Sequence, residues 1–222
     1  MKMLQGIKVT SLLMAIVMLA TLFVPAVSAK ITVDNATKDN HLEVARKLWG
    51  TDITNGEYIK QVFPEAYDES PDAATKQYYD TKMVWVDPMA DSNQIVESSA
   101  KDAQAIANGI TIYLVSCQGT VKKSSSSTIS FSSTEKMVLP SSTTKIPQMA
   151  LTTQVFRKNG DNAVLVGASY KIGTNVYTIS TSGSTAYKAG YYKMIIQGSA
   201  VWPVGVEPPT WYQVKDLGWK SL

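Results

Sequence analysis

The chain has 222 residues, 45% of them hydrophobic and 18% charged, and its formal net charge is +3. With one histidine and one cysteine, zinc sites built from these residues are excluded, and nothing in the charge points to nucleic acid. The length suits a globular chain with one core, or a core with an appended helical region.

The first 29 residues have the pattern of a secretory signal peptide. Lys2 and Lys8 precede an apolar run over residues 11–24, and small side chains follow at Val27 and Ala29. The run is shorter than the roughly 20 residues that a membrane-spanning helix needs. We therefore predict cleavage after Ala29 and a secreted mature chain that has no membrane association once the signal is removed.

Cys117 is the single cysteine, so a mature domain of this size has to depend on its hydrophobic core. Export without an internal disulfide is more typical of bacteria than of an oxidising secretory pathway. Cys117 ends an apolar strand pattern, and we expect a small buried hydrophobic side chain there. An intermolecular disulfide is the alternative.

Residues 30–105 are predicted to form an acidic, partly helical region. One helix is expected to begin at a cap among Thr37, Asp39 and Asn40, to carry an apolar face from Leu42 to Trp49, and to end at a glycine. A second is expected over residues 54–63, ended by a proline. The apolar run MVWV at residues 83–86 is typical of a short strand. Residues 91–105 are polar and alanine-bearing, which predicts a linker or a weak helix.

Residues 106–203 are predicted to form an antiparallel, Ig-like or Greek-key β-sandwich of about seven strands. The Asn159-Gly160 pair favours a hairpin between two of these strands. The serine-rich run SSSSTISFSS contains strand formers, so we expect an exposed edge strand rather than disorder. The strands are expected at residues 110–117, 128–131, 137–139, 149–155, 163–172, 175–180 and 189–202.

The stretch AGYYKMIIQGSAVW at residues 189–202 is the expected centre of the core. Its alternate residues from Tyr192 to Trp202 include Met194 and Ile196 and fall on one face of a strand. Gly190 and Tyr192 are predicted to form a structural corner of the kind found in Ig-like sandwiches.

The same segment has a Tyr-x-x-x-Tyr spacing, YKAGY at residues 187–191, which also occurs in haem-scavenging domains. We prefer a turn that enters a strand and expect no cofactor. After Trp202, prolines are predicted to end the sheet, and residues 204–222 to form a Pro/Trp-rich tail that packs on the body.

Charge divides along the same boundary. Residues 30–105 carry eight Lys or Arg and fourteen Asp or Glu, whereas residues 106–222 carry eleven and four. Opposite signs in one chain indicate either mutual docking or separate partners, and we favour docking.

No catalytic or metal-binding constellation is evident. His41 lies in a predicted helix with no nucleophile placed beside it, and the acidic cluster from Glu65 to Asp72 lacks the spacing of a calcium loop. Paired carboxylates could support a hydrolase, but the β region offers few of them. These are Glu135, Asp161, Glu207 and Asp216.

Aromatic residues gather near the C-terminus, and we identify Trp211, Tyr212 and Trp219 as a candidate ligand platform. The hypothesis is a non-catalytic extracellular module that has a binding or structural role, with a cell-wall polymer or extracellular glycan as partner. The alternative is a carboxylate-dependent hydrolase that acts on a wall or environmental polymer.

Two segments carry a resemblance: VFRKNGDNAVLV and AYKAGYYKMIIQGSAVW. Together with the leader, the Asn-Gly turn and the strand entry at Lys188, Gly190, Tyr191 and Tyr192, they resemble small exported proteins of Gram-positive bacteria that carry a β domain of unknown function. The likeness covers roughly the C-terminal half. It implies an exported β fold and supplies no catalytic residue.

Overall fold

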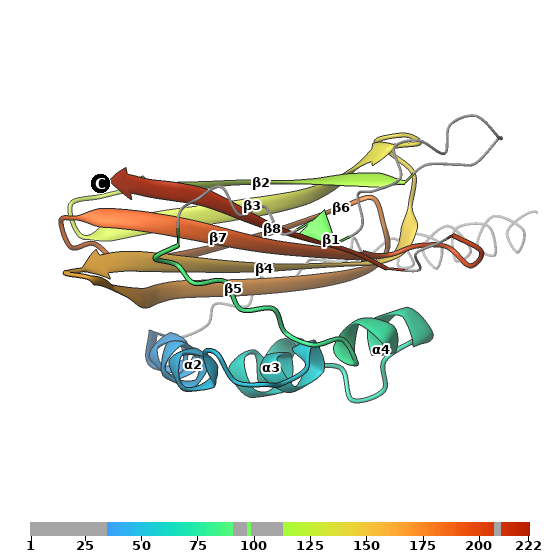
Figure 1. Ribbon diagram of the computed structural model, residues 1–222, viewed down its shortest axis with the longest axis horizontal. Helices are drawn as coiled ribbons and strands as arrows, with labels where there is room; N and C mark the ends of the chain where they lie inside the picture. The colour runs from blue at the N-terminus through green and yellow to red at the C-terminus, as the bar shows by residue number, and fades with distance from the viewer. Residues whose placement is uncertain (1–34, 91–96, 99–112, 207–209) are drawn as a thin grey trace, which may run out of the picture. The chain divides into compact units, whose positions relative to one another are not determined.

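A computed structural model describes residues 35–90, 97–98, 113–206 and 210–222. The predicted signal peptide, its cleavage site and most of the predicted linker lie outside these residues. The described part consists of two antiparallel sheets and a layer of short helices (Figure 1). The predicted fold class, a mainly β antiparallel sandwich with a short helical N-terminal region, is confirmed.

The larger sheet has the strand order β1-β8-β7-β4-β5, and neighbouring strands are antiparallel. Its strands are β1 (Glu97–Ser98), β4 (Ile146–Asn159), β5 (Asn162–Val176), β7 (Tyr191–Val201) and β8 (Thr210–Ser221). The central strand β7 is buried on both faces along almost its whole length. As predicted, one face of β7 lies in the core between the sheets, where Tyr192, Met194 and Ile196 are fully buried.

The smaller sheet has the order β2-β3-β6, with strands β2 (Leu114–Lys123), β3 (Thr128–Leu139) and β6 (Thr178–Ala186). The first four serines of the serine-rich run lie in the connection between β2 and β3, and the rest of the run begins the central strand of this sheet, so the prediction of an edge strand is wrong. The cause is that β6, which is equally rich in serine and threonine, pairs with its second side. The two short strands predicted at residues 128–131 and 137–139 are parts of the single strand β3.

The predicted hairpin joins β4 to β5, with Asn159 opposite Asn162. Its two central residues are Gly160, at a φ of 62°, and Asp161. A positive φ at the first central position belongs to the turn types that match the twist of paired strands. Gly160, and not Asn159, therefore supplies the left-handed conformation that the turn needs.

The C-terminal residues correct a predicted boundary. The sheet does not end at Pro203, because β8 pairs with β7 from Thr210 to Ser221. Pro203 lies after the last residue of β7, where it removes no ladder hydrogen bond. What we expected to be a packed tail is thus a strand of the larger sheet.

The helical layer contains α2 (Asn35–Leu48), α3 (Asn55–Val62), a 3-10 turn η1 (Pro64–Ala66) and α4 (Ala73–Tyr79). Thr54 begins α3 with a capping box, in which its hydroxyl accepts from the Glu57 N–H at 3.1 Å and the Glu57 carboxylate accepts from the Thr54 N–H at 2.7 Å. The run MVWV does not form the predicted strand. It is an extended segment held to the sheet by a 2.8 Å bond from Gln197 Nε2 to the Val84 carbonyl oxygen.

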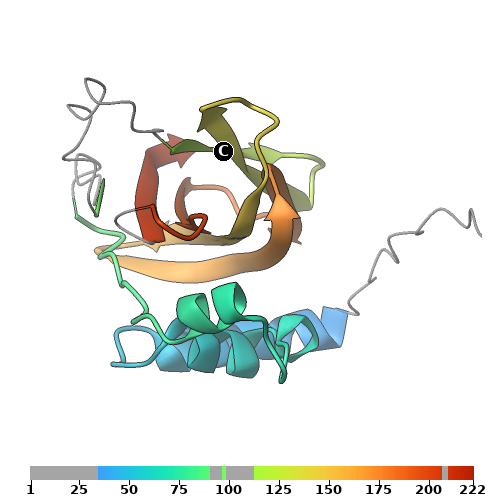
Figure 2. The same ribbon diagram turned by 90° about the vertical axis from the view of Figure 1, so that its right-hand side faces the viewer.

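Two hydrophobic cores hold these layers together. One fills the space between the sheets, and Cys117 lies in it as the predicted small buried residue. The other lies between the helices and the larger sheet and includes Tyr58, Ile59 and Ile195 (Figure 2). Among the described residues, every ion pair forms within the helical layer or within the β layer. The helical layer is therefore held on the β region by apolar packing and by hydrogen bonds, such as those from the Arg46 guanidinium to the Leu165 carbonyl oxygen at 2.7 and 2.9 Å, and not by ion pairs.

No helix in the described part of the chain is long and apolar enough to cross a membrane.

Candidate ligand-binding site

A pocket of about 270 Å³ lies between the segment after α4 and the neighbouring ends of β7 and β8. Both the helical layer and the larger sheet contribute to its walls. Its lining consists of Asn55, Tyr78, Thr81, Lys82, Val84, Ser199, Ala200, Val201, Thr210, Trp211 and Tyr212. The volume is near the lower end of the roughly 300–1,000 Å³ typical of small-molecule sites, so it fits one ring-sized group.

Asn55 holds the wall formed by the helical layer. Its backbone N–H donates to the Thr81 carbonyl oxygen at 2.8 Å, and its side-chain amide donates to the Thr81 hydroxyl at 2.9 Å. The Thr81 hydroxyl in turn donates to the Tyr78 carbonyl oxygen at 2.7 Å. Asn55 is 4% exposed, so this arrangement fixes the turn after α4 in place.

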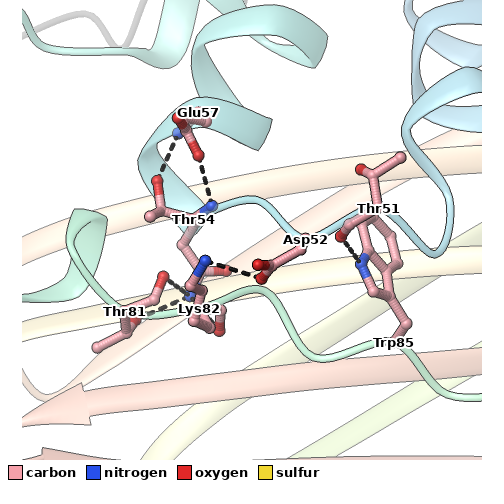
Figure 3. Close-up of polar contacts among 8 residues, drawn as sticks. Thr51, Asp52, Thr54, Glu57, Thr81, Lys82 and Trp85 are labelled. Carbon is pink, nitrogen blue, oxygen red and sulfur yellow. Dashed lines mark hydrogen bonds and ion pairs between the residues drawn. The ribbon is translucent and has the colours of Figure 1, made fainter.

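The rim of the pocket carries charge. Lys82 Nζ lies 2.7 Å from Asp52 Oδ1, and both side chains are largely exposed (Figure 3). An exposed pair of this kind contributes little to stability, because water and salt screen it. Lys82 is therefore able to exchange Asp52 for a polar group of a ligand at low energetic cost.

The floor of the pocket is apolar with a few hydroxyl groups. Ser199 is 8% exposed, and its Oγ has no hydrogen-bond partner among the described atoms. Burial raises the pKa of the Tyr78 hydroxyl, and its hydrogen bond with Thr152 offsets part of that rise, so the hydroxyl is uncharged. Burial likewise raises the pKa of Tyr212. A buried hydroxyl without a partner costs stability unless a ligand or water satisfies it, so Ser199 marks this floor as a place for a polar ligand atom.

Among the described residues, the lining contains no Asp, Glu, His or Cys. It therefore offers aromatic and aliphatic surface, hydroxyl groups and one cation, which are groups that bind a ligand. No group of three or more possible metal ligands occurs in the described part of the chain.

The structure separates the three aromatic residues that we predicted as a platform. Trp211 and Tyr212 line the pocket, whereas Trp219 packs on the helix-facing side of the sheet, with its ring centroid 5.4 Å from Lys193 Nζ. The cause is a β-bulge, where the register with β7 shifts around Gly218 at a φ of 72°. Trp211 and Trp219 have the same parity in sequence but lie on opposite faces.

At the predicted corner, the Tyr192 side chain hydrogen-bonds to the backbone four positions upstream. The Tyr192 hydroxyl accepts from the Lys188 N–H at 3.0 Å and donates to the Lys188 carbonyl oxygen at 2.6 Å, while Gly190 has a φ of 149°. Tyr187 donates its hydroxyl to the Leu222 carbonyl oxygen at 3.1 Å, and Tyr191 is 54% exposed. Tyr192 thus holds the turn before β7, and Tyr187 holds the C-terminal residue against it.

The carboxylates considered for hydrolysis lie elsewhere. Glu135 is fully buried between the sheets, and Asp216 is buried against Lys193 on the other side of the larger sheet. Asp161 forms the hairpin turn, and Glu207 lies outside the described residues. His41 has its Nε2 3.7 Å from Glu65 Oε2 and packs against Phe63.

Sequence reasoning missed most of the pocket. Asn55, Tyr78 and Ser199 come from distant parts of the chain, and only contacts between layers bring them together. One available signal was the capping box at Thr54, which places Asn55 in the first turn of α3. Comparisons with models of protein families, with curated proteins and with solved structures found no match for this chain.

Proposed function

We propose that the protein is an exported, non-catalytic module that binds an extracellular glycan, with one sugar ring seated in the pocket between the helical layer and β7–β8. The observation that carries this proposal is the buried, unpartnered Ser199 hydroxyl in a pocket with aromatic walls. Sugar rings offer an apolar face to aromatic side chains and hydroxyl groups to polar ones.

Tyr78 and Tyr212 supply the aromatic surface beside Ser199, and Lys82 stands at the rim. Trp211 lines the pocket from the side of the core between the sheets. Because the lining has no carboxylate, the site suits a neutral or weakly anionic sugar better than a cation. A binding module is thus favoured over the hydrolase that the sequence left open.

Export is the second part of the proposal, and it is supported by the basic, apolar and small-residue segments of the first 29 residues. Expression of the full chain in a bacterial host tests it. We expect protein in the culture medium with Lys30 as its N-terminal residue. A protein that stays in the cell membrane fraction with residues 1–29 still attached would contradict export.

Binding is tested by sedimentation of the exported protein with purified cell wall, peptidoglycan and insoluble glucans. Ser199→Ala removes the unpartnered hydroxyl and should weaken binding roughly fivefold, the equivalent of about 1 kcal/mol. Thr210→Trp places a large ring at the start of β8, inside the lining, and should abolish binding.

Ser169→Ala is a matched control. Ser169 is also 8% exposed with an unpartnered hydroxyl, but it lies on β5 outside the pocket lining. The Ser169→Ala variant should bind the polymers as tightly as the unmodified protein. Equal losses for Ser169→Ala and Ser199→Ala would show that the pocket is not the site.

A further inference from the structure

The outward face of the smaller sheet is a regular array of hydroxyl groups. Cross-strand register aligns Thr120, Ser132 and Ser182 in one row. Strand geometry spaces such residues about 4.8 Å apart between strands and about 6.8 Å apart along them. Three further rows run beside the first, and we call the four rows together the hydroxyl face. These rows are Gln118–Thr134–Ser180, Lys122–Ser130–Ser184 and Ser116–Lys136–Thr178.

The hydroxyl face points away from the core. The alternate residues of β3 from Ile129 to Met137 are buried between the sheets, which turns Ser130, Ser132 and Thr134 outward. In β6 the alternation is the same, and Ser180, Ser182 and Ser184 are exposed. Of the twelve residues in the four rows, nine are Ser or Thr, one is Gln and two are Lys.

The charge of this face has one sign. Its only charged residues are Lys122 and Lys136, since the carboxylate of β3, Glu135, faces the interior and is fully buried. Asp216 is neutralised by Lys193 within the structure. Two of the four acids in residues 106–222 thus add no negative charge to the surface, whereas ten of the eleven Lys or Arg of this region remain when Lys193 is left out with its partner.

The helical layer has the opposite character. Residues 35–90 contain ten Asp or Glu and six Lys or Arg, and this layer lies across the larger sheet from the hydroxyl face (Figures 1 and 2). The described part of the molecule is therefore polarised. A polyanion would be attracted to the hydroxyl face and repelled by the helical side.

We propose that the hydroxyl face binds a linear polyol-phosphate polymer, at a site separate from the glycan pocket. Phosphate oxygens accept hydrogen bonds from Ser and Thr hydroxyls and pair with Lys, and the free hydroxyls of a polyol can pair with the remaining groups. Two cations among nine hydroxyl residues match a polymer with sparse charge better than a densely sulfated one. The face holds no aromatic ring, which disfavours stacking on neutral sugars.

The repetition of rows across the hydroxyl face matters because each single contact with a polymer is weak. A polymer that touches several rows at once gains affinity from multivalency, whereas a single phosphate does not. Binding should weaken as salt rises, because the lysines and hydroxyl groups are exposed to solvent.

The test measures affinity of the full exported protein for poly(glycerol phosphate), with inorganic phosphate, dextran and a sulfated glycan as comparison probes. We expect saturable, salt-sensitive binding to poly(glycerol phosphate), little competition by inorganic phosphate and none by dextran. Tighter binding to the sulfated glycan would overturn the assignment to a polyol phosphate.

Ser132→Glu with Ser184→Glu places two negative charges in the face at exposed positions and should lower affinity at least tenfold. The matched control, Ser141→Glu with Thr143→Glu, changes the net charge equally at exposed positions in the loop after β3. An equal loss in both variants would show that overall charge, and not the face, is responsible. Circular dichroism and thermal unfolding confirm that each variant is folded.

Thr210→Trp distinguishes this site from the glycan pocket. It should leave poly(glycerol phosphate) affinity unchanged, and a loss of that affinity would overturn the claim of a separate site.

Discussion

Lys193 Nζ lies 2.7 Å from Asp216 Oδ2, and these side chains on adjacent strands are 0% and 4% exposed. Lys193 also donates to the Ala90 carbonyl oxygen at 3.1 Å, and Asp216 Oδ1 accepts from the Gly218 N–H at 2.7 Å. The pair therefore joins the segment after the helical layer to the bulge that turns Trp219. Buried charges need such partners, because removal from water costs several kcal/mol per ion.

Lys193→Met should destabilise the protein by about 3–5 kcal/mol, because it leaves Asp216 buried without a counter-charge. Adding Asp216→Asn removes that charge but keeps an acceptor for Gly218, so the double variant should regain at least half of the loss. Urea unfolding of the two single variants and the double variant measures this. Additive losses would contradict a coupled pair.

Glu135 predicts how stability depends on pH. Burial raises the pKa of Glu135 well above its usual range, and neither of its oxygens has a hydrogen-bond partner among the described atoms. The folded state thus holds the proton more tightly than the unfolded state. Below the unfolded-state pKa of about 4.3, the contribution of Glu135 to the free energy of unfolding is fully present. It is lost as pH rises towards the folded-state pKa, by at most about 1.4 kcal/mol per pH unit.

Glu135→Gln should remove this slope and raise the free energy of unfolding at neutral pH, because the side chain no longer ionises. Urea unfolding of both proteins between about pH 4 and about pH 8 checks the sign. A constant difference between them across this range would contradict a carboxyl group that is protonated in the fold.

Gly198 lies where β7 passes Cys117 and Glu135. A Cβ added there would clash with Cys117 Sγ and lie 3.3 Å from Glu135 Cδ. Gly198→Ala should destabilise by about 1–3 kcal/mol through overpacking. Cys117→Ala removes the sulfur, so the Gly198→Ala substitution should cost less in that background. Thermal unfolding of the four proteins gives the coupling, and no coupling would mean that the sulfur is not the obstacle.

Tyr192→Phe removes the hydroxyl that satisfies both backbone groups of Lys188. Because Tyr192 is fully buried, the loss should cost about 1–3 kcal/mol. The neighbouring Tyr191→Phe is the control, since Tyr191 is 54% exposed, and it should change stability by less than about 0.5 kcal/mol. Similar results for the two variants in urea unfolding would argue against the corner as a stabilising feature.

Local patterns predicted much of the fold. The parity of β7, the hairpin at Gly160 and the end of α3 before Pro64 each depend on residues within a few positions. The strand β8 was missed because prolines before it indicated an end to the sheet. That the sheet continues after Pro203 becomes evident only from the pairing of β7 with β8.

The candidate sites depended on tertiary structure. Trp211 and Tyr212 could be chosen from sequence, but their separation from Trp219 follows from the bulge at Gly218. The partnership of Asn55 with Thr81 spans 26 positions, and no local pattern reports it. The hydroxyl face likewise requires the register of three strands.

The most direct test of glycan binding in the pocket is an NMR titration of the protein with soluble peptidoglycan fragments and short glucans. We predict saturable shift changes at Ser199, at the Trp211 indole N–H and at Tyr212, with no change at the Trp219 indole N–H. In Thr210→Trp these changes should disappear. Shifts that spare the pocket, or that persist in Thr210→Trp, would contradict the account.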